Sequence, residues 1–250
     1  MTRSILTELH DGILTVTINR PETLNALTGE AFQDIGSAVA EAAGSARAFV
    51  LTGSDRAFSS GADLQESTQR LDLAEANGII RSLIDLPVPT IAAVSGPAAG
   101  IGCSLALACD YVVMSEKAYL MLAFAKIGLM PDGGATALVA ASAGRHRAMQ
   151  MALTAQKVFA PQALDWGLAS EVVAPGEQLS RAHEVAATFA HGAPLGLART
   201  KHAVNEATLT SLGEAFAREV EGQNALRATA DFAEGVAAFT EKRDAQFTGQ

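Results

Sequence analysis

The sequence predicts an α/β fold followed by a helical C-terminal region, and two observations carry this prediction. Over the first two thirds of the chain, short runs of branched apolar residues alternate with stretches of helical periodicity, a pattern typical of α/β proteins. From about Pro194 to Phe247 no strand pattern occurs. A chain of 250 residues, 49% of them hydrophobic, can bury a core without disulfides or metals. We therefore expect a core over residues 1–193 and a helical region over 194–250.

The elements expected in the first half follow from apolar spacing and from breakers. Branched apolar residues, alternating or in short runs, predict strands, and these are Ile13–Asn19, Phe49–Thr52 and Thr90–Ser95. Thr28 can cap a helix that runs to about Ala43, where apolar residues recur at helical spacing. A further helical stretch should end near Leu86, because the two prolines of 87–89 disfavour the α conformation of the residues before them.

The second half reads as shorter elements and then as helices. The glycine-rich segment Gly96–Gly102 is predicted to be a turn that leads into a short helix over Cys103–Cys109. Two short strands follow at Tyr111–Met114 and Ala118–Leu122. The segment Met130–Gly134 should form a turn that opens a helix toward Ala143, and after Arg145 the pattern is almost wholly helical except for a brief strand at Glu171–Val173.

Composition excludes several classes of function. With 18 basic and 27 acidic residues the net charge is −9, which argues against nucleic-acid binding. Neither an apolar signal core nor an uninterrupted apolar span of membrane length occurs, and Cys103 and Cys109 are expected to be buried thiols. We therefore expect a cytoplasmic protein with no membrane partner. The five histidines lack metal-ligand spacing, so no metal is assigned.

Two loops share a design that favours binding of negative charge. Each follows a strand, consists of small residues and precedes a helix: Ser60-Gly61-Ala62-Asp63 and Gly96–Gly102. Their backbone N–H groups are little screened by side chains, and free N–H groups at a helix start attract anions. If the loops faced each other, they would form a two-donor oxyanion hole. The alternative, which spacing alone favours, is that both are merely tight turns.

Six segments, taken together, resemble the crotonase (enoyl-CoA hydratase/isomerase) superfamily. They occur in the order of the family motifs and extend over nearly the whole chain. The segments are Asn19–Leu27 (NRPETLNAL), Ala57–Leu64 (AFSSGADL), Pro89–Cys103 (PTIAAVSGPAAGIGC), Ala108–Asp110 (ACD), Lys126–Gly134 (KIGLMPDGG) and Phe239–Arg243 (FTEKR). Each motif is weak alone, and the set is specific.

The resemblance implies a crotonase-like spiral of repeated ββα units with a C-terminal trimerisation region, so a homotrimer or a dimer of trimers. It also implies an acyl-CoA thioester as ligand, with no cofactor beyond the coenzyme A moiety. The thioester oxygen would lie between the N–H groups of Ala62 and Ile101, where relatives more often carry glycine at the second position. Substrate and coenzyme contacts would come from Arg20, Thr23, Leu24, Ser60, Asp63, Leu64 and Phe124, and from Lys242 reaching a neighbouring subunit.

The chemistry depends on which acid or base stands beside the thioester. Family hydratases use two glutamates, and this chain has Ser104 and Phe124 at those positions. The remaining candidate is Asp132, which the resemblance matches to an acidic residue of double-bond isomerases. Asp132 could also be the N-cap of the following helix, and both roles can hold together. We expect an isomerase with Asp132 as acid and base. The alternatives are a hydratase using Asp132 and an ordered water, or a catalytically silent acyl-CoA-binding protein.

Overall fold

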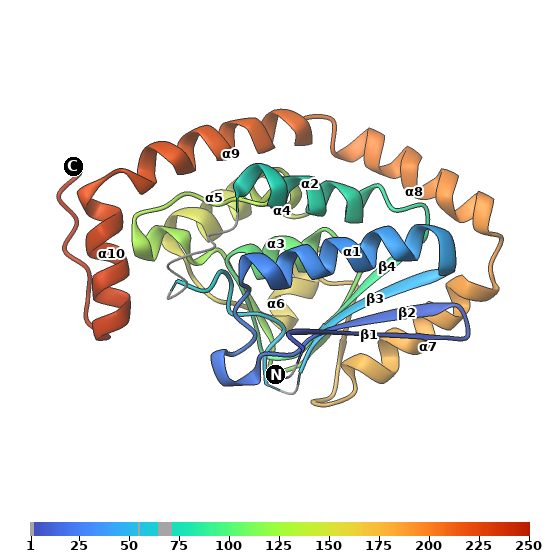
Figure 1. Ribbon diagram of the computed structural model, residues 1–250. Helices are drawn as coiled ribbons and strands as arrows, with labels where there is room; N and C mark the ends of the chain where they lie inside the picture. Colours follow the sequence, from blue (N-terminus) through green and yellow to red (C-terminus); the bar gives the residue numbers. More distant parts are fainter. Residues whose placement is uncertain (1–2, 55, 65–71) are drawn as a thin grey trace.

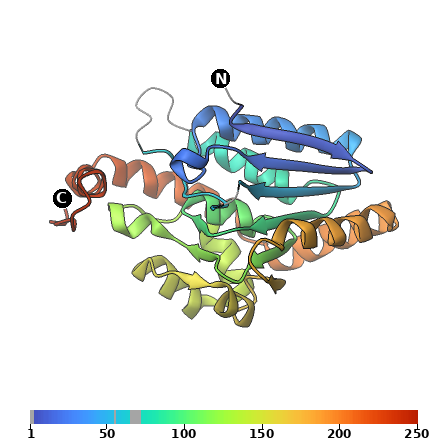
Figure 2. The same cartoon turned by 90° about the horizontal axis from the view of Figure 1, so that it is seen from below.

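The larger of two sheets organises the molecule. The structure is a computed structural model that describes residues 3–54, 56–64 and 72–250. In this part of the chain six strands form one sheet in the order β1-β2-β3-β4-β6-β9. Only β1 is antiparallel to its neighbour among these strands. Figure 2 shows β1 and β2 at one edge of this sheet. The strands are β1 (Ile5–His10), β2 (Ile13–Ile18), β3 (Ala48–Gly53), β4 (Thr90–Val94), β6 (Tyr111–Ser115) and β9 (Glu171–Val173).

A smaller sheet includes part of the glycine-rich segment 96–102, and it corrects one prediction. Its strands are β5 (Pro97–Ala99), β7 (Tyr119–Met121) and β8 (Val158–Phe159). The segment 96–102 is therefore not a simple turn, because β5 pairs with β7 in parallel. The helix after it begins at Ile101 rather than at residue 103. Glycine and proline mask such a short strand in the sequence, because both residues are depleted in strands.

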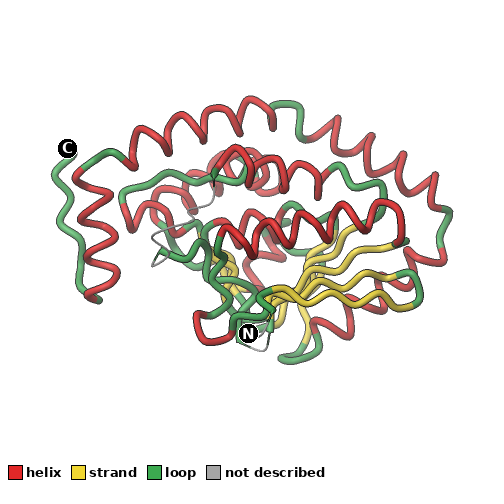
Figure 3. The backbone as a smooth tube through the Cα atoms, in the orientation of Figure 1, coloured by secondary structure: helices red, strands yellow, loops and turns green. Residues whose placement is uncertain are grey.

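Helices cover both faces of the larger sheet (Figures 1 and 3). The main apolar core lies between the sheet and the helices that precede residue 170, and a second core packs Ala182, Val185 and Ala186 of α7 against the opposite face. The helices are α1 (Gly29–Ser45), α2 (Leu73–Ile84), α3 (Ile101–Leu107), α4 (Ala135–Ala143), α5 (Arg145–Thr154), α6 (Ala160–Asp165) and α7 (Gln178–His191), with the 3₁₀ turns η1 (Pro21–Thr23) and η2 (Ala123–Ile127).

Local sequence explains where several elements begin. The Thr28 hydroxyl accepts a hydrogen bond from the Ala31 N–H at 3.1 Å, so it caps α1 as predicted. The alternation of β2 matches its burial, with Leu14, Val16 and Ile18 facing the core. The strand β1 was not predicted, because five of its six residues are exposed and an edge strand of this kind carries little apolar periodicity.

The last three helices form an outer layer over the core (Figure 1). They are α8 (Pro194–Thr208), α9 (Leu212–Arg227) and α10 (Ala230–Glu241), and the absence of strands predicted from residue 194 onward is confirmed. Lys201 of α8 anchors the layer through an ion pair of 2.8 Å with Asp110, with only 8% of the lysine side chain exposed. No helix in the described ranges is both long and apolar enough to span a membrane.

Candidate active site

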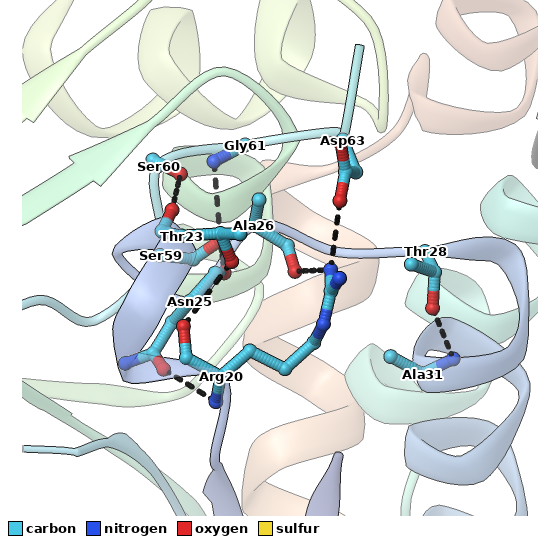
Figure 4. Close-up of polar contacts among 10 residues, drawn as sticks. All are labelled: Arg20, Thr23, Asn25, Ala26, Thr28, Ala31, Ser59, Ser60, Gly61 and Asp63. Atoms are coloured by element: carbon cyan, nitrogen blue, oxygen red, sulfur yellow. Dashed lines mark hydrogen bonds and ion pairs between the residues drawn. The ribbon is translucent and has the colours of Figure 1, made fainter. Parts of the chain in front are cut away.

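The loop of residues 60–63, the first loop, is held against the turn that follows β2 (Figure 4). The segment 96–102 is the second loop. The Ser60 N–H donates to the Leu24 carbonyl at 3.0 Å, and the Ser60 hydroxyl donates to the Thr23 carbonyl at 3.0 Å. The buried Ser59 hydroxyl donates to the Asn25 carbonyl at 2.8 Å and accepts the Gly61 N–H at 3.1 Å. These bonds hold the three residues that precede Ala62 and so fix the path of the chain that leads to it.

Arg20 and Asp63 form a second tie between the same two segments. The Arg20 Nη1 atom lies 3.0 Å from Asp63 Oδ2 and donates to the Ala26 carbonyl at 2.6 Å (Figure 4). Both side chains are largely buried, with 18% and 14% exposed. The guanidinium therefore orders the loop that carries Ala62 through the Asp63 carboxylate. Whether Arg20 also contacts a coenzyme phosphate stays a prediction.

The second functional loop lies directly against the first. Ser59 and Ala98 form a parallel bridge, and the Ala99 N–H donates to the Ser59 carbonyl at 2.9 Å. A Cβ atom at Gly61, which has a φ of +102°, would lie 3.0 Å from the Ala99 carbonyl oxygen. Glycine is thus required at Gly61 both by its backbone conformation and by the close approach of the loops.

The two predicted donors are left available by this packing. Ile101 is the first residue of α3, and the first N–H groups of a helix have no intrahelical acceptor. The N–H of Ala62, an exposed residue, is likewise not engaged by the described residues, because its bridge to Leu27 uses the Gly61 carbonyl and the Asp63 N–H. Two adjacent loops thus each offer a backbone donor, as an oxyanion hole requires.

The two positions where family hydratases carry glutamate have other roles here. Phe124 of η2 is 7% exposed, and its ring tip would lie 3.9 Å from a Cβ atom at Gly100, so its aromatic ring lies beside the second loop. Ser104 of α3 is fully buried and donates its hydroxyl proton to the Asp132 carbonyl at 2.8 Å. Ser104 lies three residues after Ile101 in α3. Its hydrogen bond therefore holds the backbone of Asp132 against the helix that carries the Ile101 donor.

Asp132 does not cap α4, so that interpretation is wrong. The N-cap of α4 is Gly134, and the carboxylate that accepts the N–H groups of Gly134 and Thr136, at 2.7 and 3.0 Å, belongs to Glu219 of α9. Glu219 was not predicted as a functional residue, because it lies more than 80 residues away in the chain. The pattern that marks it is a polar residue in a helical stripe whose other members, Leu212 and Ala215, are buried.

The Asp132 carboxyl is buried and has one oxygen without a partner. Its side chain is 6% exposed, and Oδ2 accepts a hydrogen bond of 2.9 Å from Gln223 of α9. Oδ1 is buried and has no hydrogen-bond partner in the described part of the molecule. Burial, with Glu219 adding negative charge nearby, raises the pKa of Asp132 to about 7, although Arg227 opposes the shift. A carboxyl with this pKa can both take and return a proton near neutral pH.

Four further residues were predicted to contact the substrate or coenzyme A, and three of them lie near the first loop. Thr23 and Leu24 belong to the turn that holds the first loop, and Leu64 follows that loop as a half-buried residue. Lys242 is exposed and ends α10 with a φ of +57°. The structure brings the first three together with Ala62, and their contacts with coenzyme A, like that of Lys242, stay predictions. No cluster of three potential metal ligands occurs in residues 3–54, 56–64 and 72–250.

Asp132 should make the folded protein less stable as the pH rises. A carboxyl whose pKa is near 7 when folded and 3.8 when unfolded binds its proton more tightly in the folded state. Its stabilising contribution is complete below pH 3.8 and is lost as the pH rises through 7. We expect Asp132→Asn, relative to wild type, to gain stability between pH 4 and 8, by at most roughly 4 kcal/mol. Urea unfolding of both proteins across this range measures the difference, and parallel curves would contradict the expectation.

Comparisons with solved structures identify the class of protein. An enoyl-CoA hydratase from Mycobacterium avium subsp. paratuberculosis superimposes with a TM-score of 0.93 over 99% of this chain and 100% of that one, at 45% identity. The predicted crotonase-like fold is thereby confirmed. The model of the family described as enoyl-CoA hydratase/isomerase matches residues 8–250, and the chain belongs to that family of acyl-CoA enzymes.

Curated relatives carry names from both branches of the chemistry. A protein of Rhodobacter capsulatus named probable enoyl-CoA hydratase is 40% identical, with 97% of each chain aligned. The 1,2-epoxyphenylacetyl-CoA isomerase of Escherichia coli is 36% identical over the full length of both chains. The family is therefore established, and these names leave the choice between hydration and isomerisation to the chemistry of the site.

Proposed function

We propose that this protein isomerises the double bond of an enoyl-CoA thioester, with Asp132 as the single acid and base. The observation that carries the proposal is the buried Asp132 carboxyl, with a pKa near 7 and one oxygen not engaged by the described residues. The backbone of Asp132 is hydrogen-bonded to Ser104 of α3, and the first residue of this helix would supply one of the two backbone donors. Phe124 and Ser104 provide no second carboxylate at the hydratase positions.

The reaction needs one proton to leave one carbon and return to another. The N–H groups of Ala62 and Ile101 would bind the thioester oxygen and stabilise the negative charge that forms there. Asp132 Oδ1 takes a proton from the acyl chain, and the electron pair left on carbon is delocalised to the thioester oxygen as a dienolate. Asp132 then returns a proton two carbons away, so that the double bond moves and no atom is gained or lost. In turnovers where the carboxyl exchanges with the solvent before this step, the returned atom comes from water. Hydration would also need a group to hold and activate water.

Substrate contacts are proposed for the residues around this centre. Phe124, Ile101 and Leu64 would line the acyl chain, because two of them are buried apolar residues beside the second loop and the third follows the first loop. Thr23, Leu24 and Ser60, with the Arg20–Asp63 pair behind them, would contact the coenzyme portion. No group beyond the coenzyme A moiety of the substrate is needed for this chemistry.

Hydration is the alternative, favoured by the names of the Rhodobacter relative and of the mycobacterial structure. A panel of enoyl-CoA thioesters that differ in double-bond position, incubated in deuterated water, separates the possibilities by mass spectrometry. A moved double bond, with deuterium uptake but no added water, supports isomerisation. Addition of one water contradicts it and supports the hydratase. Binding of the thioesters without any conversion would instead identify a catalytically silent binder.

We also propose that residues 194–250 assemble the protein into a homotrimer or a dimer of trimers. Leu195, Val204 and Phe239 of the outer helical layer expose 81%, 55% and 64% of their surface, which a subunit interface would cover. Leu212 and Phe232 of the same layer are buried within the subunit instead. Sedimentation equilibrium at micromolar concentration should give three or six times the 25.8 kDa chain mass, and a monomer would refute the proposal. The cytoplasmic location stays a prediction.

A further inference from the structure

Helix α9 presents a row of polar side chains to Asp132. Glu219, Gln223 and Arg227 are spaced by four residues, so they lie on one face of the helix. Glu219 and Gln223 are completely buried. Both bind the segment 130–136 and neither belongs to the loops that carry the backbone donors. A fully buried glutamate and glutamine on a surface layer need a reason beyond packing, because burial of polar groups is costly.

The Gln223 amide is held in one orientation by two acceptors. Its Nε2 atom donates to the Met130 carbonyl at 2.7 Å and to Asp132 Oδ2 at 2.9 Å. A carbonyl oxygen only accepts hydrogen bonds, so a flipped amide would place oxygen against oxygen. The amide hydrogens are thus both used, and Oδ2 of Asp132 is fixed as a hydrogen-bond acceptor. The proton that Asp132 exchanges is thereby directed to Oδ1.

Glu219, and not Asp132, accepts the free N–H groups at the start of α4. Its two carboxylate oxygens accept the N–H groups of Gly134 and Thr136 and the Thr136 hydroxyl, so they satisfy the start of α4. Asp132, two residues before Gly134, is then not needed as a cap. Glu219 also raises the pKa of Asp132 by its charge, and Arg227 lowers it. Ser104 and Ile80, which approach the same turn from α3 and α2, carry no charge.

We propose that α9 supplies the positioning residues of the proton-transfer group: Gln223 holds Asp132 Oδ2 so that Oδ1 alone exchanges the proton, and Glu219 caps α4 in place of Asp132. This inference rests on the proposed function for its catalytic meaning. It makes the outer helical layer part of the reaction machinery rather than only a scaffold or an interface.

Two nearly isosteric substitutions should shift the pKa of Asp132 in opposite directions. Gln223→Met removes the donor to the carboxylate, so the pKa of Asp132 should rise by about one unit. Glu219→Gln removes a nearby negative charge, so that pKa should fall by about one unit. The exposed neighbours on the same helix give matched controls, Asn224→Met and Glu221→Gln, which should leave it unchanged. Carboxyl NMR titration of ¹³C-aspartate-labelled protein measures the pKa, with the Asp132 resonance assigned by its loss in Asp132→Asn.

Turnover of a trans-3-enoyl-CoA by the same variants shows whether the positioning matters for catalysis. Gln223→Met should lower kcat by about 10- to 100-fold with KM nearly unchanged, because misplacement of the base affects the chemical step rather than thioester binding. If both pKa values match their controls, the inference is overturned even where Asp132→Asn abolishes turnover and the proposed function stands. Opposite pKa shifts in an enzyme that tolerates Asp132→Asn would overturn the proposed function and leave the control of the carboxyl by α9 in place. Should Gln223→Met fail to fold, Glu219→Gln alone decides the pKa effect.

Discussion

Replacing Asp132 by asparagine is expected to lower kcat for double-bond isomerisation by at least about 100-fold, the typical cost of losing a general base. Asparagine keeps the size of the side chain and an oxygen that can accept the Gln223 hydrogen bond, but it cannot take a proton as a carboxylate does. KM should change little, because the N–H groups of Ala62 and Ile101 are untouched. Steady-state kinetics with a trans-3-enoyl-CoA measure both quantities.

The pH profile and a matched variant make this test specific. Wild-type turnover should fall as the pH drops below about 7, because the base must be ionised to accept the proton and burial raises the pKa of Asp132 to about 7. Asp34→Asn, on the exposed face of α1, should retain the wild-type rate and profile. Equal turnover by wild type and Asp132→Asn would remove the proposed mechanism, and the protein would then need another base.

Most of the fold is predictable because burial leaves periodic patterns in the sequence. The alternation in β2 and the apolar stripe of α1 locate these elements, and Thr28 marks the start of the helix. The strands that were missed, β1, β5 and β8, are an exposed edge strand and two strands of two or three residues. The strands β5 and β8 are fixed by pairing with β7, which is separated from both in the chain. β1 pairs with the adjacent β2, but its exposed residues leave little apolar periodicity in the sequence.

The site is predictable only in part, for a related reason. The loops with Ala62 and Ile101 are recognisable because their glycines are required by close backbone approach. The environment of Asp132 is not, because Ser104, Glu219 and Gln223 reach it from α3 and α9 across large separations in the chain. The sequence suggested that Asp132 was a cap, a base or both. The structure separates the two roles by assigning the cap to Glu219.

Removing the N–H of Ala62 should lower kcat by about 100- to 1000-fold, the usual cost of losing one donor of an oxyanion hole. Incorporation of lactic acid at position 62 replaces this N–H by an ester oxygen and keeps the methyl side chain. The thioester oxygen would then bind the Ile101 donor alone. The lost hydrogen bond matters most in the transition state, because negative charge develops on this oxygen there. Nonsense suppression with the α-hydroxy acid provides the protein, and single-turnover kinetics report the chemical step.

The neighbouring residue gives the matched control, since its N–H has a purely structural partner. The Asp63 N–H donates to the Leu27 carbonyl at 2.9 Å, so the α-hydroxy analogue of aspartate at position 63 should reduce thermal stability while kcat stays close to wild type. Both esters weaken the carbonyl before them as an acceptor, and the comparison cancels that shared effect. If the two esters slowed the reaction equally, the loss would reflect loop distortion. A selective loss at position 62 is expected only if that N–H binds the oxygen on which charge develops.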